Sequence, residues 1–201
     1  MKVTVVESLW IYIVFAMIAL ASCQSHAPEQ VPTKVPSPNP IPEPTSIVVF
    51  HMAFAESDWD GKKIPDGQQC RSYGGQDPST PPLIVSNIPE EANAIILEFS
   101  DRDYSPMDNG GHGIIGFTIL EGTEEVLIPS VPSNTFDLPE NFFLVREHKQ
   151  NVLFTPGAYM PPCSGGRGNS YYVTAKAVEM ISMDDLTFNI LEESILELGR
   201  Y

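Results

Sequence analysis

The placement of the prolines constrains this chain more than any other feature. Of its 19 prolines, seven fall in the short segment 26–46, at positions 28, 32, 36, 38, 40, 42 and 44. Proline fixes φ and carries no N–H donor, so prolines at this spacing exclude helix and sheet. We expect residues 23–46 to form an extended tether and residues 47–201 to form the folded domain. A proline-rich ligand for another protein is the alternative interpretation of this segment.

The residues before the tether have the pattern of a secretory signal. Lys2 gives a weakly positive start, and Leu9 to Ala21 is almost wholly apolar but shorter than a comfortable membrane span. The run ends in Leu20-Ala21-Ser22-Cys23, which resembles the bacterial lipobox. We predict a signal peptide over residues 1–22, lipidation of Cys23, and export to the cell envelope with the domain anchored to a bacterial membrane. An uncleaved helical anchor is the alternative.

The charge and apolar content exclude two classes of protein. The formal net charge is −15, and a chain this acidic repels phosphate backbones, so we expect no nucleic-acid partner. An apolar fraction of 42% excludes global disorder. About 155 residues remain after the tether and show no repeat or second linker, so one domain is the economical interpretation.

Strand patterns dominate the predicted domain. They cover residues 47–54, 94–99, 114–120, 126–128 and 172–178, and clusters rich in Gly, Pro, Asn and Asp separate them. Only the C-terminal segment has a pattern that clearly predicts a helix. Phe188, Leu191, Ile195 and Leu198 recur at three and four residues, with Ser182 and Asp185 as the opening turn and Gly199 as the stop. The pattern therefore predicts a mostly β domain with few helices.

Four segments, in this order, carry a family resemblance. They are Trp59–Pro65; Gly74–Leu83 followed by Asn87–Glu90; Asp101–Pro106 followed by His112; and Tyr159–Gly166 running into Asn169–Tyr171. Together they resemble the phosphatidylethanolamine-binding protein family, and most closely its bacterial and archaeal Raf-kinase-inhibitor-like branch. The resemblance covers residues 47–201. It implies a large central antiparallel sheet, a smaller second sheet, and one or two peripheral helices including the C-terminal one.

The resemblance also implies a small anion-accepting pocket at one end of the sheet. The family's first motif maps onto Asp101 and Asp103, its histidine onto His112, and its second motif onto the segment from Pro162 to Tyr171. We therefore predict a ligand site made of Asp101, Asp103, His112, Pro162, Asn169 and Tyr171. The chain departs from the family at Arg102, which replaces a proline; at Gly113, which replaces an aromatic residue; and at Asn169, which replaces a second histidine. Arg102, Arg167 or Asn169 are the donors that would compensate; the alternative is a degraded site that no longer binds what its relatives bind.

Physical chemistry alone gives these residues several interpretations. A carboxylate on one nitrogen of His112 would fix the tautomer and raise the pKa of the ring. Asp101 or Asp103 would do this and would also accept from an ethanolamine ammonium, while Gly110, Gly111 and Gly113 would leave the backbone open to a ligand. In the bland alternative, the aspartates cap a turn and the histidine is structural. A divalent-metal site and a Ser/His/Asp site are the other interpretations; neither a further metal ligand nor a nucleophile elbow is evident, so we expect no metal and no cofactor.

The two cysteines that remain after lipidation lie in the second and fourth parts of the resemblance. Export places Cys70 and Cys163 in an oxidising compartment, and both would flank the implied pocket. We predict a disulfide between them; two buried thiols are the alternative.

The sequence thus leads to one main function and two alternatives. The main expectation is a membrane-tethered, non-catalytic protein that binds a small anion or a phospholipid headgroup. The first alternative is an interaction or inhibitor scaffold for a protein partner in the cell envelope. The second is a hydrolase acting on a small phosphorylated compound, which would need another acid/base group near His112.

Overall fold

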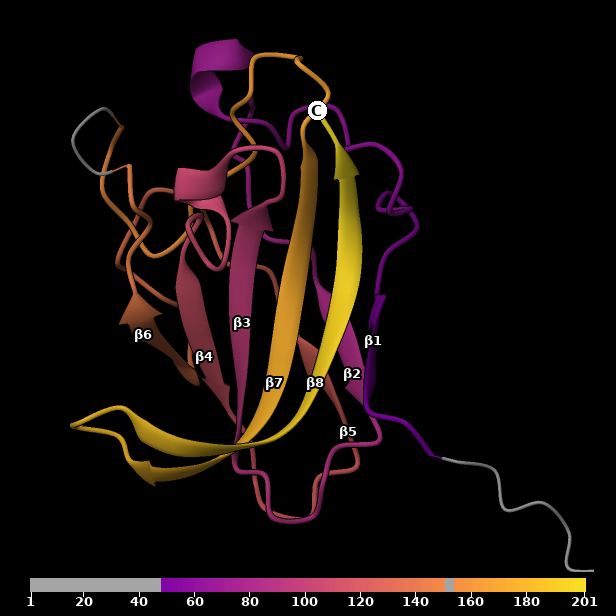
Figure 1. The fold of residues 1–201 in the computed structure, drawn as a ribbon, viewed down its shortest axis with the longest axis vertical. Helices are drawn as coiled ribbons and strands as arrows, with labels where there is room; N and C mark the ends of the chain where they lie inside the picture. Colours follow the sequence, from indigo (N-terminus) through magenta and orange to yellow (C-terminus); the bar gives the residue numbers. More distant parts are fainter. Residues whose placement is uncertain (1–47, 151–153) are drawn as a thin grey trace, which may run out of the picture. The chain divides into compact units, whose positions relative to one another are not determined.

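The most buried strand of the molecule is β3 (Ala94–Asp101), at the centre of a five-stranded antiparallel sheet (Figure 1). The computed structural model describes residues 48–150 and 154–201. The order of the sheet is β6-β4-β3-β7-β8. Its other strands are β4 (Ile114–Thr118), β6 (Phe142–Arg146), β7 (Ser170–Ser182) and β8 (Thr187–Arg200). The consecutive apolar residues of β3 fit a strand that is buried on both faces.

A smaller three-stranded antiparallel sheet packs against one face of the larger one. It has the order β1-β2-β5 and consists of β1 (His51–Phe54), β2 (Leu83–Ser86) and β5 (Glu125–Ile128). Two short 3-10 turns, η1 (Arg71–Tyr73) and η2 (Ser105–Met107), lie in the connections. The predicted mostly β class with a large and a smaller antiparallel sheet is confirmed.

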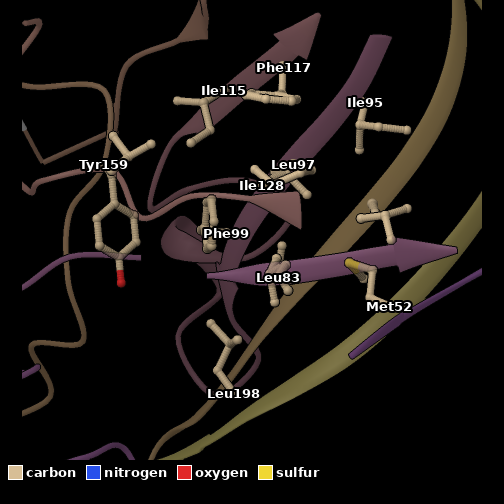
Figure 2. Packing of buried hydrophobic residues seen from close by; sticks show 14 of the residues in the cluster. Met52, Leu83, Ile95, Leu97, Phe99, Ile115, Phe117, Ile128, Tyr159 and Leu198 are labelled. Atoms are coloured by element: carbon tan, nitrogen blue, oxygen red, sulfur yellow. The ribbon is translucent and has the colours of Figure 1, made fainter. Parts of the chain in front are cut away.

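Alternation along β3 divides its side chains between two apolar clusters. Ile95, Leu97 and Phe99 face the smaller sheet and pack with residues such as Leu83 of β2 (Figure 2). Ala94 and Ile96 belong to a second cluster on the opposite face. Because successive side chains of a strand point to opposite faces, one strand contributes to both clusters. The buried part of β3 therefore runs up to the end of the strand, where Asp101 lies.

The predicted C-terminal helix is wrong, because residues 187–200 form β8. The pairing of β8 with β7 is interrupted by irregularities that leave Leu191 and Leu198 as extra residues in the ladder. Each extra residue shifts the alternation by one, so the steps from Phe188 to Leu191 and from Ile195 to Leu198 span three residues although the backbone is extended. The predicted opening turn does form. The Ser182 hydroxyl bonds with the Asp185 carboxylate and backbone N–H, but this turn connects β7 to β8.

No α-helix occurs in residues 48–150 and 154–201, so the predicted peripheral helices are also absent from this part of the chain. Nor does this part contain a helix long and apolar enough to cross a membrane. The predicted signal peptide, the lipidation site Cys23 and the proline-rich tether lie outside the described residues. The strand predictions from the sequence do not include β2 and β6, although strands of the same length, β1, β4 and β5, are predicted.

Candidate functional site

A cavity of about 370 Å³ lies where β3 ends and β7 begins. Asp101, the last residue of β3, is paired in the ladder with Tyr171 of β7. The predicted site residues on the cavity wall are Asp101, Asp103, His112, Asn169 and Tyr171. The other lining residues are Tyr104, Met107, Gln150, Phe154, Met160, Cys163, Ser164 and Arg167. Five of the six predicted ligand-binding residues are thus brought to one cavity by the fold.

The sixth, Pro162, lies beside this cavity. It lines a void of about 10 Å³ that also touches His112 and Tyr159. The carbonyl of Pro162 accepts the N–H of Cys70 at 2.8 Å. Its evident contribution is therefore to the position of the loop that carries Cys163.

Asp101 is a buried carboxylate held by two uncharged donors. Only 3% of the residue is exposed. Its Oδ1 accepts the backbone N–H of Asp103 at 2.9 Å, and its Oδ2 accepts Nδ2 of Asn169 at 2.7 Å. No ion pair within the described residues involves Asp101. The carboxylate is therefore oriented by dipoles and has no cation of the chain beside it.

Asp103 lies two residues further along, at a more exposed position. Its Oδ2 accepts the backbone N–H of Ser170 at 2.6 Å. That hydrogen bond is the main cause that lowers the pKa of the Asp103 carboxyl below its ordinary value, and the charges of Arg200 and Arg102 act in the same direction. Asp103 is therefore charged at neutral pH.

His112 is fixed at both its backbone and its ring. Its N–H donates to the Phe99 carbonyl at 3.0 Å, and its carbonyl accepts the N–H of Met160 at 2.8 Å. The ring Nδ1 lies 2.8 Å from the Met160 carbonyl. A carbonyl oxygen only accepts, so Nδ1 carries a proton and Nε2 is left for a ligand.

The expected carboxylate partner of His112 is therefore wrong. The ring bonds to the backbone carbonyl of Met160, and burial lowers the pKa of the imidazole from 6.5 to about 4. The Met160 carbonyl and the Asp101 charge oppose this shift but do not outweigh the desolvation of the charged form. At neutral pH His112 is uncharged and offers a lone pair at Nε2.

The three donors expected to replace the missing histidine have different roles. Arg167 lines the cavity and makes no hydrogen bond or ion pair with any other described residue. The amide of Asn169 is used by Asp101. Arg102 forms an ion pair with Glu197 and lies 4.2 Å from the ring centroid of Tyr172, away from the cavity. Of the three, only Arg167 is therefore a cation available at the site.

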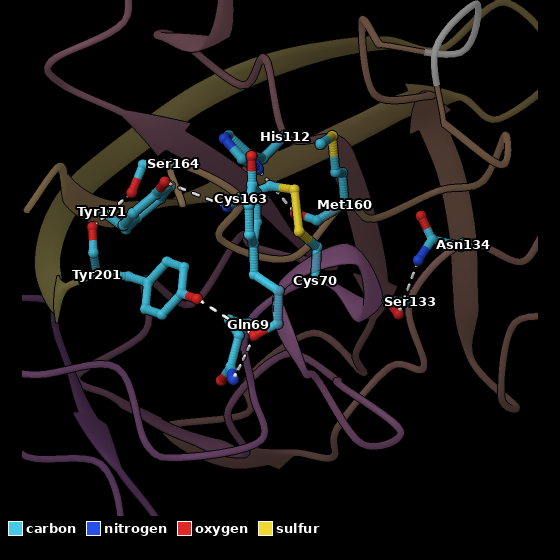
Figure 3. The surroundings of a disulfide bond; sticks show 11 residues. Gln69, Cys70, His112, Ser133, Asn134, Met160, Cys163, Ser164, Tyr171 and Tyr201 are labelled. Atoms are coloured by element: carbon cyan, nitrogen blue, oxygen red, sulfur yellow. Dashed lines mark hydrogen bonds between the residues drawn. A yellow bond between two sulfur atoms is a disulfide. The ribbon is translucent and has the colours of Figure 1, made fainter. Parts of the chain in front are cut away.

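The predicted disulfide between Cys70 and Cys163 is present and borders the cavity (Figure 3). The Cys163 N–H donates to the Tyr171 hydroxyl at 3.2 Å, and the Tyr171 ring meets the His112 ring edge to face at 5.4 Å. Burial is the main cause that raises the pKa of Tyr171 to about 12. The disulfide thus supports the wall of the site through Tyr171.

The glycines around His112 pack against other atoms of the chain, so they do not open the backbone to a ligand. A Cβ on Gly113, whose φ is +119°, would lie 1.9 Å from the carbonyl oxygen of Ala158. A Cβ on Gly111 would lie 2.2 Å from Cα of Met107. The expectation that these residues leave room for a ligand is therefore wrong, because another chain segment fills that space.

The sequence patterns do not indicate several of the lining residues. Gln150 and Phe154 come from the connection between β6 and β7 and carry no motif or periodic pattern. Tyr104 and Met160 lie inside the segments that carry the family resemblance, but their residue types give no reason to choose them. Within the described residues, no group of three or more His, Cys, Asp or Glu could hold a metal ion. The Ser164 hydroxyl donates to the Tyr201 carbonyl, so it is not paired with His112.

Comparison with known proteins identifies the fold. No protein-family model and no curated protein matches the sequence. One similar solved structure is YbcL from Escherichia coli, described as a new member of the mammalian phosphatidylethanolamine-binding protein family. The two sequences are 14% identical, and the structures match with a TM-score of 0.52 over 77% of this chain and 98% of YbcL. The chain has a phosphatidylethanolamine-binding protein fold. CT736 from Chlamydia trachomatis, a candidate homologue of that family, is 20% identical over 76% of this chain and 97% of its own, with a TM-score of 0.46.

Proposed function

We propose that this chain is a membrane-tethered, non-catalytic binding protein whose pocket takes a small zwitterionic compound of the phospholipid-headgroup type. The observation that carries the proposal is the cavity at the end of β3, with carboxylates and a cation on its wall. Its volume of about 370 Å³ falls at the small end of the range for small-molecule sites. It suits a headgroup better than a whole lipid.

The charges on the wall match the two ends of such a compound. Asp101 and Asp103 are the carboxylates of the wall that would accept an ammonium group. Arg167 has no partner among the described residues, and its planar fork suits phosphoryl oxygens. A zwitterion offers both partners, whereas the overall charge of −15 opposes the approach of a simple anion.

We assign no reaction to this pocket. General acid–base catalysis needs a group whose pKa lies near the working pH, and the pKa of His112 is lowered to about 4. The serine on the wall, Ser164, uses its hydroxyl proton on the Tyr201 carbonyl. Binding without chemistry is the simpler use of this set of groups.

The tether is the second part of the proposal. Cys23 follows Leu20-Ala21-Ser22, and the domain begins after the proline-rich segment. Expression with a labelled fatty acid tests it. Label should enter the wild-type chain and be lost in Cys23→Ala, whereas label in both chains or in neither contradicts lipidation.

Calorimetric titration of phosphoethanolamine into the full chain in detergent micelles tests the pocket. His112→Asn retains an amide N–H for the Met160 carbonyl but removes the Nε2 acceptor, and we expect it to weaken binding about tenfold. Glu121→Gln, in the loop between β4 and β5 at the opposite end of the sheet, is the control and should bind as the wild type does. Equal affinity in His112→Asn, or no binding in any chain, contradicts the proposal. An envelope protein recovered equally by wild type and His112→Asn would favour the scaffold alternative.

A further inference from the structure

One face of the larger sheet has no second layer of described residues upon it. The smaller sheet packs on the face to which Leu97 and Phe99 point, and it lies behind the five strands in Figure 1. The opposite face, which we call the outer face, carries the apolar cluster around Ala94 and Ile96. All members of that cluster come from the five strands themselves. Because sheets normally bury an apolar face against another layer, the bare outer face needs an explanation.

Apolar side chains of the outer face reach the surface. Ile190 is 47% exposed and Ile195 is 59% exposed. Ile190 pairs with Val178 of the outer cluster, and Ile195 pairs with Thr174, which lies on the same side of β7. The partly buried apolar residues of this face are Phe143, Val145, Met180 and Phe188. Apolar side chains gathered on one face among polar ones mark an interaction site.

The charges on this face are paired with one another. Lys176 Nζ lies 2.9 Å from a carboxylate oxygen of Glu98 and 3.7 Å from one of Glu193. Arg102, just after β3, forms an ion pair with Glu197. Three carboxylates and two cations nearly cancel, although the chain as a whole has a formal net charge of −15. The outer sides of β3, β7 and β8 therefore repel a second acidic chain less than an unpaired acidic surface would.

The size of the outer face is close to that of a protein interface. With a rise of ~3.3 Å per residue and ~4.8 Å between strands, each residue of a sheet covers about 16 Å². The five strands therefore present roughly 700 Å² on this side. A standard interface buries about 800 Å² per partner. A second sheet packed face to face would cover an area of this order.

We propose that the outer face is the interface between two copies of this chain, which pack their larger sheets face to face about a two-fold axis. In such a dimer the same patch meets itself, so it has to be apolar and free of unpaired charge. The outer face has both properties. A basic partner would instead bind where carboxylates form no ion pair with a described residue, as in the loops that carry Glu90, Glu121 and Glu124.

Sedimentation velocity of the full chain in density-matched detergent micelles tests the dimer, at protein concentrations from about 1 μM to about 1 mM. We expect the wild-type chain to dimerise within this range. Ile195→Lys should weaken dimerisation about tenfold or more, because an ammonium would be removed from water at the interface. The variant should keep its fold, since Ile195 is exposed and the new ammonium would lie near Glu193 and Glu197 on the same side of β8.

Leu120→Lys is the matched control. Leu120 is 83% exposed and lies in the loop between β4 and β5, so the same change is made away from the outer face. This variant should dimerise as the wild type does. Ile190→Lys repeats the test at a second exposed position of the outer face, and it decides the question if thermal unfolding shows that Ile195→Lys is not folded.

The dependence on salt distinguishes an apolar interface between like-charged chains from an electrostatic one. Raising the salt concentration from about 20 mM to about 150 mM shortens the range of the repulsion between two acidic chains. The dimer should therefore become tighter. A dimer that becomes weaker with added salt contradicts an interface of this kind.

Two other outcomes overturn the proposal. A wild-type chain that stays monomeric over the whole range leaves the outer face to a different protein. Equal association of the wild type, Ile195→Lys and Ile190→Lys places the contact on another surface or in shared micelles. The outer cluster has no residue in common with the cavity wall at the end of β3, so either result leaves headgroup binding intact.

Discussion

Reduction of the Cys70–Cys163 disulfide should remove a large part of the stability of the domain. The two cysteines are separated by 93 residues, so the bond closes a long loop that includes β2 to β6. Reduction keeps both sulfur atoms in place. The comparison of oxidised and reduced protein therefore isolates the cross-link from any loss of packing.

The expected magnitude follows from the length of the loop. A cross-link restricts the unfolded chain by an entropy that grows with the logarithm of the number of residues enclosed. For a separation of 93 residues, this gives about 4.6 kcal/mol at 25 °C. A domain of this size loses about 2–4 °C of Tm per kcal/mol, so Tm should fall by about 9–18 °C. Since globular proteins are stable by about 5–15 kcal/mol, reduction removes a large share of the total.

Urea unfolding of the full chain in detergent micelles, with and without reductant, measures this difference. Thiol titration of the denatured chain should find two more reactive thiols after reduction than before. The midpoint should shift to lower urea, and the m-value should rise because the reduced unfolded chain exposes more surface. A loss below about 1 kcal/mol would refute the loop-entropy argument, and unchanged thiol counts would refute the bond itself.

Two further predictions concern the surroundings of His112. The pKa of its ring is about 4 in the folded protein, against an ordinary value of 6.5 that the unfolded chain keeps. As pH falls, the unfolded chain therefore binds a proton first, and the free energy of unfolding should decrease by about 2 kcal/mol between pH 7 and pH 5. Urea unfolding at each pH measures this loss, and an equal dependence on pH in His112→Asn would contradict the prediction. Gly113→Ala should lower the free energy of unfolding by about 3 kcal/mol or more, because its Cβ would meet the Ala158 carbonyl. The matched variant Gly166→Ala is also at positive φ but has no atom within 4 Å of the new Cβ, and it should lose about 1–2 kcal/mol. Equal losses in Tm for the two variants would contradict the clash.

The sequence predicts the strands that have a simple apolar or alternating pattern; it misses β2 and β6 and assigns a helix to β8. Residues 94–99 and 172–178 are predictable as strands because apolar or alternating residues run without a break, as β3 and β7 show. Residues 187–200 imitate a helix because Leu191 and Leu198 are extra residues that reproduce a helical spacing. Periodicity reports spacing along the chain, and only pairing with β7 distinguishes a bulged strand from a helix.

The candidate site is also only partly predictable from the sequence. Asp101, Asp103 and His112 are identifiable from the sequence because the resemblance to a family places them in motifs, and the fold brings them to one cavity. The charge state of His112 is not encoded in any motif. It depends on burial and on the carbonyl of Met160, 48 residues away. Every residue has a backbone carbonyl, so the sequence does not indicate which carbonyl a ring will contact. The sequence therefore suggests a carboxylate partner for His112, whereas the ring bonds to the Met160 carbonyl.

The irregular pairing of β8 has a consequence for the behaviour of the protein at high concentration. β8 is the outer strand of the five-stranded sheet, and a long, flat outer strand is a template for the strand of another molecule. The extra residue at Leu191 distorts this edge, and the exposed carboxylates of Glu192 and Glu193 follow it directly. The extra residue at Leu191, which gives β8 the apolar spacing of a helix, therefore also protects the sheet against edge-to-edge aggregation.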